Sequence, residues 1–207
     1  DPARPWEEEG VLARHDLHLF RHEVLRRRSP HTGRTHAFTR LHSPDWVNVI
    51  AFLAGEADRE LLVVEQFRHG LDQSTLEIPG GVCDPGETPL ESAQRELVEE
   101  SGFAAERWIS LGSCAPNPAT QSNHCHFFLA LDCHATGALE LDPAEELRLW
   151  AVPWSEWKQK LRDGGVVRGR DELDGVRRQF RRREAGAAGI GEGGVGADRL
   201  VAATEDD

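Results

Sequence analysis

One segment, from Gly81 to Phe103, constrains this chain of 207 residues more than any other. It reads GVCDPGETPLESAQRELVEESGF, and it carries the signals of both ends of a helix. Thr88 begins a capping-box pattern, Pro89 suits the first helical position, and Gly102 suits a left-handed terminator. We therefore predict a helix over about residues 89–101, followed directly by a turn.

Four glutamates lie in or beside this predicted helix: Glu87, Glu96, Glu99 and Glu100. The helical period places the last three on one face, next to an apolar stripe formed by Leu90, Ala93 and Leu97. Like charges this close repel by ~0.2–0.5 kcal/mol per pair on an exposed helix. Arg95 can neutralise one of them, whereas Mg²⁺ or Mn²⁺ takes several oxygen ligands, often carboxylates together with substrate phosphate. A solvated acidic helix face is the alternative, but the fixed spacing of the whole segment favours a metal site.

The segment resembles the Nudix box, G-x5-E-x7-R-E-U-x-E-E-x-G-U with U a bulky apolar residue, and it meets every specified position. The resemblance implies hydrolysis of a nucleoside diphosphate linked to another group, with Mg²⁺ or Mn²⁺ as cofactor. It also implies an α/β (α+β) fold, an α/β/α sandwich with a mixed β-sheet. By position it implies metal-ligand roles for Glu96, Glu99 and Glu100. Arg95 matches the arginine that orients them, and Glu87 matches a supporting glutamate; Glu99, Glu100 and Arg95 are therefore candidate catalytic residues.

Two segments outside the box bear on the substrate. The stretch VVEQFRHG, followed by EIPGG, resembles the Q-aromatic-R and E-x-P-A/G-G segments of ADP-ribose and nucleoside-diphosphate-sugar pyrophosphatases. The resemblance implies substrate-binding roles for Gln66, Arg68 and Glu77, and a metal-ligand role for the Gly80 carbonyl. Arg68 can fork onto a diphosphate, and Glu77 can accept from a base amino group or a ribose hydroxyl. The alternatives are a surface ion pair for Arg68 and a hydrogen-bonded strand end for Glu77.

A loop beyond the box supplies further candidates. Pro118 lies fifteen positions after Phe103, where the ADP-ribose pyrophosphatases of the family carry a proline. The surrounding sequence, APNPATQSNHCHFF, is less acidic than theirs, which widens the substrate choice, and Asn123 is a candidate substrate-binding residue. Glu145 and Glu146, in LDPAEELRLW, are candidates for the catalytic base or an extra metal ligand, and the sequence does not choose between them. The alternative for Pro118 is a plain turn after a strand, and the alternative for Glu145 and Glu146 is a solvated acidic turn.

Charge and composition exclude several other classes of function. A net charge of −12 argues against broad binding to nucleic acid or an anionic membrane. No apolar run approaches the ~18–20 residues of a transmembrane helix, and the start, DPARPWEEEG, lacks the features of a secretory signal. We expect a cytoplasmic protein whose four cysteines are reduced thiols in or near the core.

The chain reads as one catalytic domain over residues 1–183, with an N-terminal β arm at 11–45 and a core at 46–183. Residues 184–207 read as a flexible tail rich in Gly, Ala and acids. Strands are predicted at 17–25, 34–41, 46–53, 60–67, 108–115, 125–133 and 147–152, and later helices at 153–161 and 171–183. The resemblance implies a homodimer in which the arm packs against the partner.

The sequence thus favours metal-dependent hydrolysis of ADP-ribose or a nucleoside-diphosphate sugar, giving a nucleoside monophosphate and a sugar phosphate. One alternative is hydrolysis of nucleoside triphosphates or dinucleotides. Another is a non-catalytic Nudix module that senses a nucleotide sugar.

Overall fold

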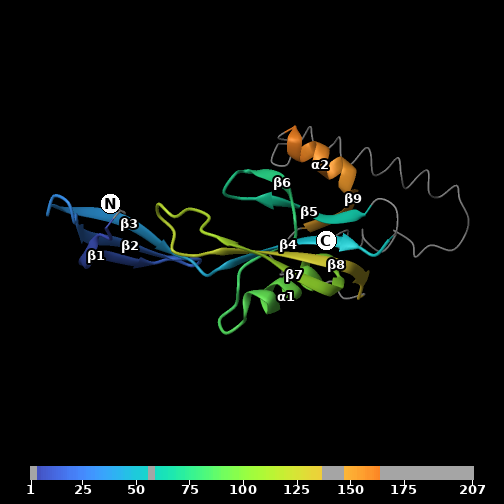
Figure 1. Cartoon of the computed structure of the whole chain (residues 1–207), viewed down its shortest axis with the longest axis horizontal. Coiled ribbons are helices and arrows are strands. Elements are labelled where there is room, and N and C mark those ends of the chain that lie inside the picture. Colours follow the sequence, from blue (N-terminus) through green and yellow to red (C-terminus); the bar gives the residue numbers. More distant parts are fainter. Residues whose placement is uncertain (1–3, 56–58, 137–146, 164–207) are drawn as a thin grey trace, which may run out of the picture.

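The computed structural model describes residues 4–55, 59–136 and 147–163, which form two sheets and two helices (Figure 1). The strands are β1 Glu7–Asp16, β2 Arg21–Arg28, β3 Thr35–His42, β4 Trp46–Leu53, β5 Glu60–Arg68, β6 Gln73–Glu77, β7 Phe103–Cys114, β8 Cys125–Ala135 and β9 Leu147–Pro153. The helices are α1 Pro89–Ser101 and α2 Trp154–Arg162. In Figure 1 the sheet of β1, β2 and β3 extends from one end of the larger sheet as an arm.

The larger sheet is mixed, as predicted. Its strands follow the order β6-β5-β4-β8-β7, and β9 also pairs with β5. The β4–β8 pair is parallel, whereas the other described pairs are antiparallel. Strands β4 and β5 are joined through one described pair, Phe52 opposite Leu61, and β9 runs along the other edge of β5 from Glu60 to Gln66.

The two helices cover opposite faces of this sheet, so the predicted α/β/α sandwich is confirmed (Figure 1). Ala93 and Leu97 of α1 pack into one apolar cluster with Val47, Val49, Ala51, Leu62, Phe128, Ala130 and Cys133. Trp157 of α2 packs into a second cluster with Phe52, Leu61, Val63, Leu76, Leu131 and Val152. Burying apolar area on both faces at ~25 cal/mol per Å² is what holds the three layers together.

Helix α1 begins and ends where its sequence signals place it. Thr88 Oγ1 accepts the Glu91 N–H at 3.3 Å, and the Glu91 carboxylate accepts the Thr88 N–H at 2.7 Å. Gly102 has φ 68° and donates its N–H to Val98 O at 2.8 Å. The apolar stripe is shorter than predicted, because Leu90 lies in the first turn, before the helix meets the sheet, and is 38% exposed.

The core strands agree with the prediction apart from two differences. Strand β7 begins at Phe103, directly after the helix terminator, rather than at residue 108. Strand β6 was not predicted, because QSTLE is short and polar and is held by pairing with β5. The predicted helix at 171–183 and the tail lie outside the described residues.

The arm differs more from the prediction, since it has three strands and begins at Glu7. The first predicted strand, 17–25, is wrong in its limits: it lies over the turn after β1 and the start of β2. Strand β1 was not predicted because it begins with three acids and a glycine, which are uncommon in strands. In the structure its acids pair with arginines across the sheet. Glu8 accepts from Arg27 at 3.0 Å, and Glu9 pairs with Arg26 at 3.7 Å. Such cross-strand pairs stabilise a sheet of low apolar content.

Within the described residues, none of the helices has the length and apolar character needed to cross a bilayer.

The left-handed end of α1 gives a stability prediction. Gly102→Ala places a Cβ at φ 68° and is expected to lower the free energy of unfolding by about 1 kcal/mol. Gly55→Ala is the control, because no atom lies within 4 Å of the added Cβ and φ is not positive there. Urea unfolding at pH 7 measures both, and an equal loss of stability in the two variants would contradict the prediction.

Candidate active site

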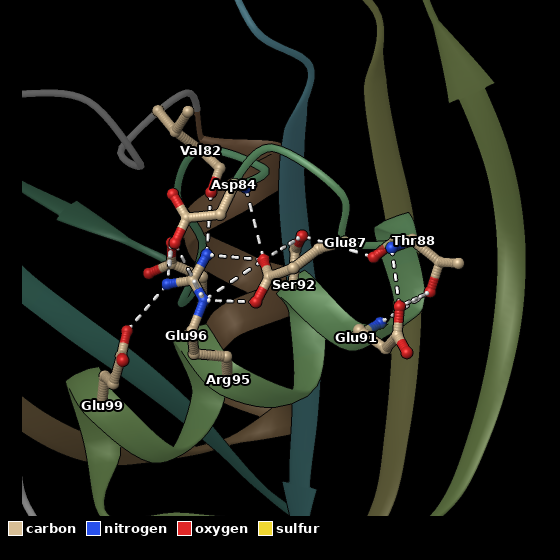
Figure 2. A network of polar contacts seen from close by, with 9 residues as sticks. All are labelled: Val82, Asp84, Glu87, Thr88, Glu91, Ser92, Arg95, Glu96 and Glu99. Atoms are coloured by element: carbon tan, nitrogen blue, oxygen red, sulfur yellow. Dashed lines mark hydrogen bonds and ion pairs between the residues drawn. The ribbon is translucent and has the colours of Figure 1, made fainter.

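Arg95 lies at the centre of a polar network that gathers the acids of α1 (Figure 2). Its Nε donates to Glu87 at 3.0 Å, and its Nη1 donates to Glu96 at 3.0 Å and to Glu99 at 2.8 Å. Its Nη2 donates to the Val82 carbonyl at 2.9 Å. Burial lowers the pKa of Arg95, but the hydrogen bonds with Glu87 and Glu99 and the charge of Glu96 raise it overall. One guanidinium therefore binds three carboxylates and the loop before the helix.

Glu100 is held separately from this network. It is 5% exposed, and its carboxylate accepts the Gly80 N–H at 2.9 Å. Residues 79–81 run beside β4, where Val49 donates to Pro79 O at 2.8 Å and Val47 to Gly81 O at 2.9 Å. The Gly80 N–H therefore bonds to Glu100, while the carbonyls of Pro79 and Gly81 on either side bond to β4. The metal-ligand role of the Gly80 carbonyl stays a prediction.

Two glycines are needed for this close packing. A Cβ on Gly80 would lie 2.2 Å from the Val47 carbonyl oxygen, and one on Gly81 would lie 2.3 Å from Glu96 Oε1. Gly80 therefore lets the segment approach β4, and Gly81 leaves room for the Glu96 carboxylate. Only the Gly81 requirement was contained in the predicted box.

The donor set fits a divalent cation by its chemistry. Glu96, Glu99, Glu100 and the Gly80 carbonyl offer the hard oxygen ligands that Mg²⁺ and Mn²⁺ prefer. Among the described residues, however, no three His, Cys, Asp or Glu side chains converge closely enough to hold a metal as they stand. The hydrogen bonds of Arg95 to Glu96 and Glu99 account for their positions. Arg95 bonds to Oε1 of Glu96 and to Oε2 of Glu99, so each carboxylate has a second oxygen besides the one that accepts from Arg95.

Glu87 has a structural role in this network, as its predicted supporting function requires. Besides Arg95, it accepts from Ser92 Oγ at 2.7 Å and from the Asp84 N–H at 3.3 Å. The Arg95 and Ser92 hydrogen bonds lower its pKa to about 2. Ser92 was missed by sequence reasoning, since a buried serine in a helix has no distinctive pattern.

Arg68 and Glu77, both predicted to bind substrate, bind each other across the β5–β6 pair. Arg68 Nε and Nη2 donate to the two Glu77 oxygens at 2.9 and 2.7 Å, and Thr75 Oγ1 also bonds to Glu77. Burial raises the pKa of Glu77, but the Arg68 and Thr75 hydrogen bonds lower it overall. Gln66, opposite Thr75, has a buried Oε1 without a hydrogen-bond partner. The ion pair weighed as an alternative for Arg68 is therefore present in this structure.

The loop 115–124 between β7 and β8 brings Pro118 against the arm. Leu41 of β3 donates to Thr120 O at 2.7 Å and accepts from the Ser122 N–H at 3.1 Å. A cavity of about 230 Å³ lies between the two parts, lined by Trp6, Leu25, Arg27, Phe38, Thr39, Arg40 and residues 118–121. The Nε atoms of Arg27 and Arg40 are buried there without a hydrogen-bond partner. These arginines are far from the box in sequence, and no pattern in the sequence singled them out.

Asn123 lies in the same loop but not in the lining of that cavity. It is 2% exposed, and neither its amide nitrogen nor its amide oxygen has a hydrogen-bond partner. Burying an amide without hydrogen-bond partners is costly, so Asn123 is an exception among the buried polar side chains. The candidate bases Glu145 and Glu146 lie outside the described residues, so their position relative to the site stays a prediction.

The chain is similar to known proteins in sequence. A model of the NUDIX domain matches residues 44–171, more than half of the chain. The methanol dehydrogenase activator of Bacillus methanolicus is 36% identical over 81 residues, and the ADP-ribose pyrophosphatase of Bacillus subtilis (strain 168) is 35% identical over 81 residues. Each match covers 39% of this chain and 44% of the relative, so it spans less than half of each relative's length.

The fold also has a solved counterpart. The crystal structure of an ADP compounds hydrolase superposes with a TM-score of 0.67, covering 91% of this chain and 98% of that one. The two sequences are 23% identical, so this likeness concerns the fold.

The low pKa of Glu87 predicts how stability depends on pH. The Glu87 carboxylate has a folded-state pKa of about 2 against an ordinary value of 4.5, so its stabilising effect is fully present above pH 4.5 and is lost toward pH 2. Glu87→Gln should therefore melt below the wild type at pH 7, with a difference in Tm that shrinks as the pH falls to 2. Glu106→Gln, on an exposed position of β7, is the control. A Tm difference for Glu87→Gln that is constant with pH would contradict this assignment.

Proposed function

The chain belongs to the Nudix family, and on that premise we propose that it hydrolyses the pyrophosphate bond of ADP-ribose or a nucleoside-diphosphate sugar. The products would be a nucleoside monophosphate and a sugar phosphate. The observations that carry the proposal are the hydrogen bond between the Gly80 N–H and Glu100 and the hydrogen bonds of Arg95 to Glu96 and Glu99, which hold three carboxylates of α1. The name of the ADP-ribose pyrophosphatase relative supports an ADP-containing substrate.

We propose Mg²⁺ or Mn²⁺ as the cofactor, held by Glu96, Glu99, Glu100 and the Gly80 carbonyl. Such an ion neutralises charge on a diphosphate and lowers the pKa of a bound water. Arg95 orients the carboxylates, since its hydrogen bonds to Glu96 and Glu99 keep both side chains on the same side of α1. Glu87 in turn fixes Arg95.

Substrate binding is proposed for two groups of residues, one on β5 and β6 and the other at the cavity beside Pro118. Arg68 is positioned by Glu77 and would contact the diphosphate, while Glu77 and Gln66 would contact the ribose or base. The cavity beside Pro118 combines the rings of Trp6 and Phe38 with the guanidinium groups of Arg27 and Arg40. Rings suit stacking on a base, and guanidinium groups suit phosphate oxygens. Asn123, whose buried amide nitrogen and oxygen have no hydrogen-bond partner, is proposed to contact the substrate.

The base that activates the attacking water is proposed to be Glu145 or Glu146. Both precede β9 in the sequence, and the first residue of β9, Leu147, pairs with Gln66 of β5.

Two alternatives share the same acidic site. A hydrolase of nucleoside triphosphates or dinucleotides would use the same metal ligands with a different pocket. A sensing module would bind a nucleotide sugar without turnover. The substrate is not expected to be a nucleic acid or a membrane lipid, because of the net charge of −12.

Hydrolysis assays test the proposed activity. With Mg²⁺ or Mn²⁺, ADP-ribose, ADP-glucose, UDP-glucose and GDP-mannose are compared with dinucleoside polyphosphates and dNTPs, and the products are identified. We expect kcat/KM for the best diphosphate sugar to exceed that for dNTPs at least about tenfold, or about 1.4 kcal/mol in transition-state binding. Comparable rates on dNTPs would overturn the substrate assignment.

A variant of Glu100 separates an enzyme from a sensor. Glu100→Gln keeps an oxygen to accept the Gly80 N–H but removes the charge, so the fold should persist while kcat falls at least about 100-fold. Glu106→Gln, the same chemical change on an exposed strand position, should retain full activity. Tight binding of ADP-ribose by both wild type and Glu100→Gln, with turnover in neither, would identify a sensor.

A homodimer is proposed through the arm. Its turn and first strand expose Val11, Leu12, Leu17, Leu19 and Phe20, which is an unusual apolar surface for a sheet that otherwise relies on charge. Sedimentation equilibrium should give twice the 23.0 kDa of the chain, and Leu12→Ser with Leu19→Ser should shift the protein to monomer. A wild-type monomer at assay concentration would remove this proposal.

A further inference from the structure

We propose that Cys114 and Cys125 form a reversible disulfide at the base of the loop 115–124, making this strand pair a site of oxidative modification. The inference does not depend on the proposed hydrolysis. It concerns two thiols that have no part in the acidic site.

Strand register brings these cysteines together. Cys114 is the last residue of β7, Cys125 is the first residue of β8, and the two are direct partners in the antiparallel ladder. Direct partners have Cα atoms about 4.5 or 5.5 Å apart, depending on the kind of pair. Both separations fall within the roughly 4.4–6.8 Å that disulfides span, and directly opposite side chains lie on the same face.

The two thiols differ in access, which gives the reaction an order. Cys114 is exposed, contrary to the expectation of thiols in or near the core, whereas Cys125 is 5% exposed and its Sγ accepts from Asn48 Nδ2 at 2.8 Å. Burial raises the pKa of the Cys125 thiol. The exposed thiol therefore meets an oxidant first, and the buried thiol acts as the resolving group.

The chemistry balances with a small-molecule disulfide, such as glutathione disulfide, as the oxidant. The Cys114 thiolate attacks one oxidant sulfur, which forms a mixed disulfide and releases one glutathione thiolate. Cys125 then loses its proton and attacks Cys114 Sγ, which forms the protein disulfide and releases the second glutathione. The two cysteines are oxidised by two electrons, the oxidant is reduced to two thiols, and the two protons pass to the departing thiolates.

The remaining cysteines provide controls. Cys133 is buried, opposite Ala105 in the same ladder, and burial raises its pKa to about 12. Cys83 is half-buried in the segment before α1. It lies near enough to Cys125 for its charge to raise the pKa of the Cys125 thiol. Cys83 is therefore the competing partner that the experiment has to exclude.

The bond would fix the loop at its base. The far part of the loop already bonds to the arm, through Leu41 with Thr120 and Ser122. In the reduced protein only the strand pairing closes the base of the loop, whereas in the oxidised protein a covalent bond would close it as well. Oxidation is thus expected to slow hydrogen exchange in residues 115–124.

Thiol mapping of the full chain tests the proposal. Native reduced protein is treated with glutathione disulfide, quenched with an alkylating reagent and digested. We expect the free thiols to fall from four to two, a Cys114–Cys125 cross-linked peptide, and at least about threefold slower exchange in the loop, all reversed by a dithiol reductant. Cys83→Ser and Cys133→Ala should keep the cross-link, whereas Cys114→Ser should abolish it and leave Cys125 free.

Several results would overturn the proposal. These are four alkylated cysteines after treatment, a stable glutathione adduct on Cys114 beside an unreacted Cys125, and a Cys83–Cys125 cross-link. Wild-type mapping alone decides among these outcomes, so a control variant that folds poorly leaves the test intact.

Discussion

The ion pairs of Arg95 are the interaction on which the candidate site depends. Glu96 and Glu99 of α1 and Glu87 just before the helix carry like charges, which repel one another. Arg95 contacts Glu87, Glu96 and Glu99 at once and also bonds to Val82 in the preceding loop. It therefore joins two tasks: it offsets the repulsion, and it fixes the loop 81–87 to α1 (Figure 2). A cation that displaced Arg95 from Glu96 and Glu99 would still find Arg95 anchored by Glu87 and Val82.

The arm follows the same principle with less apolar support. Glu23 is buried and accepts from Arg40 at 2.8 Å, from His42 at 2.8 Å and from Arg14 at 2.9 Å. The Arg40 and His42 bonds lower its pKa to about 2, so the group is ionised throughout the neutral range. Because Arg40 also lines the cavity beside Pro118, the charge of Glu23 fixes a wall of that cavity. Charge pairing between strands thus contributes both to the fold of the arm and to the shape of the pocket.

The sequence predicted features that depend on local spacing and missed those that depend on contacts between distant segments. The capping box, the left-handed Gly102 and the grouping of acids around Arg95 all arise within one turn or two of helix, so a single segment contains their causes. Strand β1 was missed because its acids are stabilised by arginines of β2, which propensity does not register. The bidentate bond between Arg68 and Glu77 and the cavity arginines likewise depend on strand register and on how the arm meets the loop. Leu90 is an error of the opposite kind. Its helical spacing was correct, but spacing alone does not show which residues of the stripe the sheet covers.

The same difference applies to the two parts of the candidate site. Local contacts build the acidic site, whereas contacts between distant segments build the cavity beside Pro118. The acidic site is built by one contiguous segment, residues 79–101, which is held against β4 by the bonds of Val47 and Val49. The cavity, by contrast, needs β2, β3 and the loop 115–124 to stay in register, and the loop is held by two backbone bonds to Leu41 and by a bond between Ser122 and His42 at 3.1 Å. His42 also bonds to Glu23, so the loop, the arm and its buried charge form one connected unit. Any event that changes the loop, such as a covalent bond at its base, would therefore alter which ligand fits while leaving the acids of α1 in place.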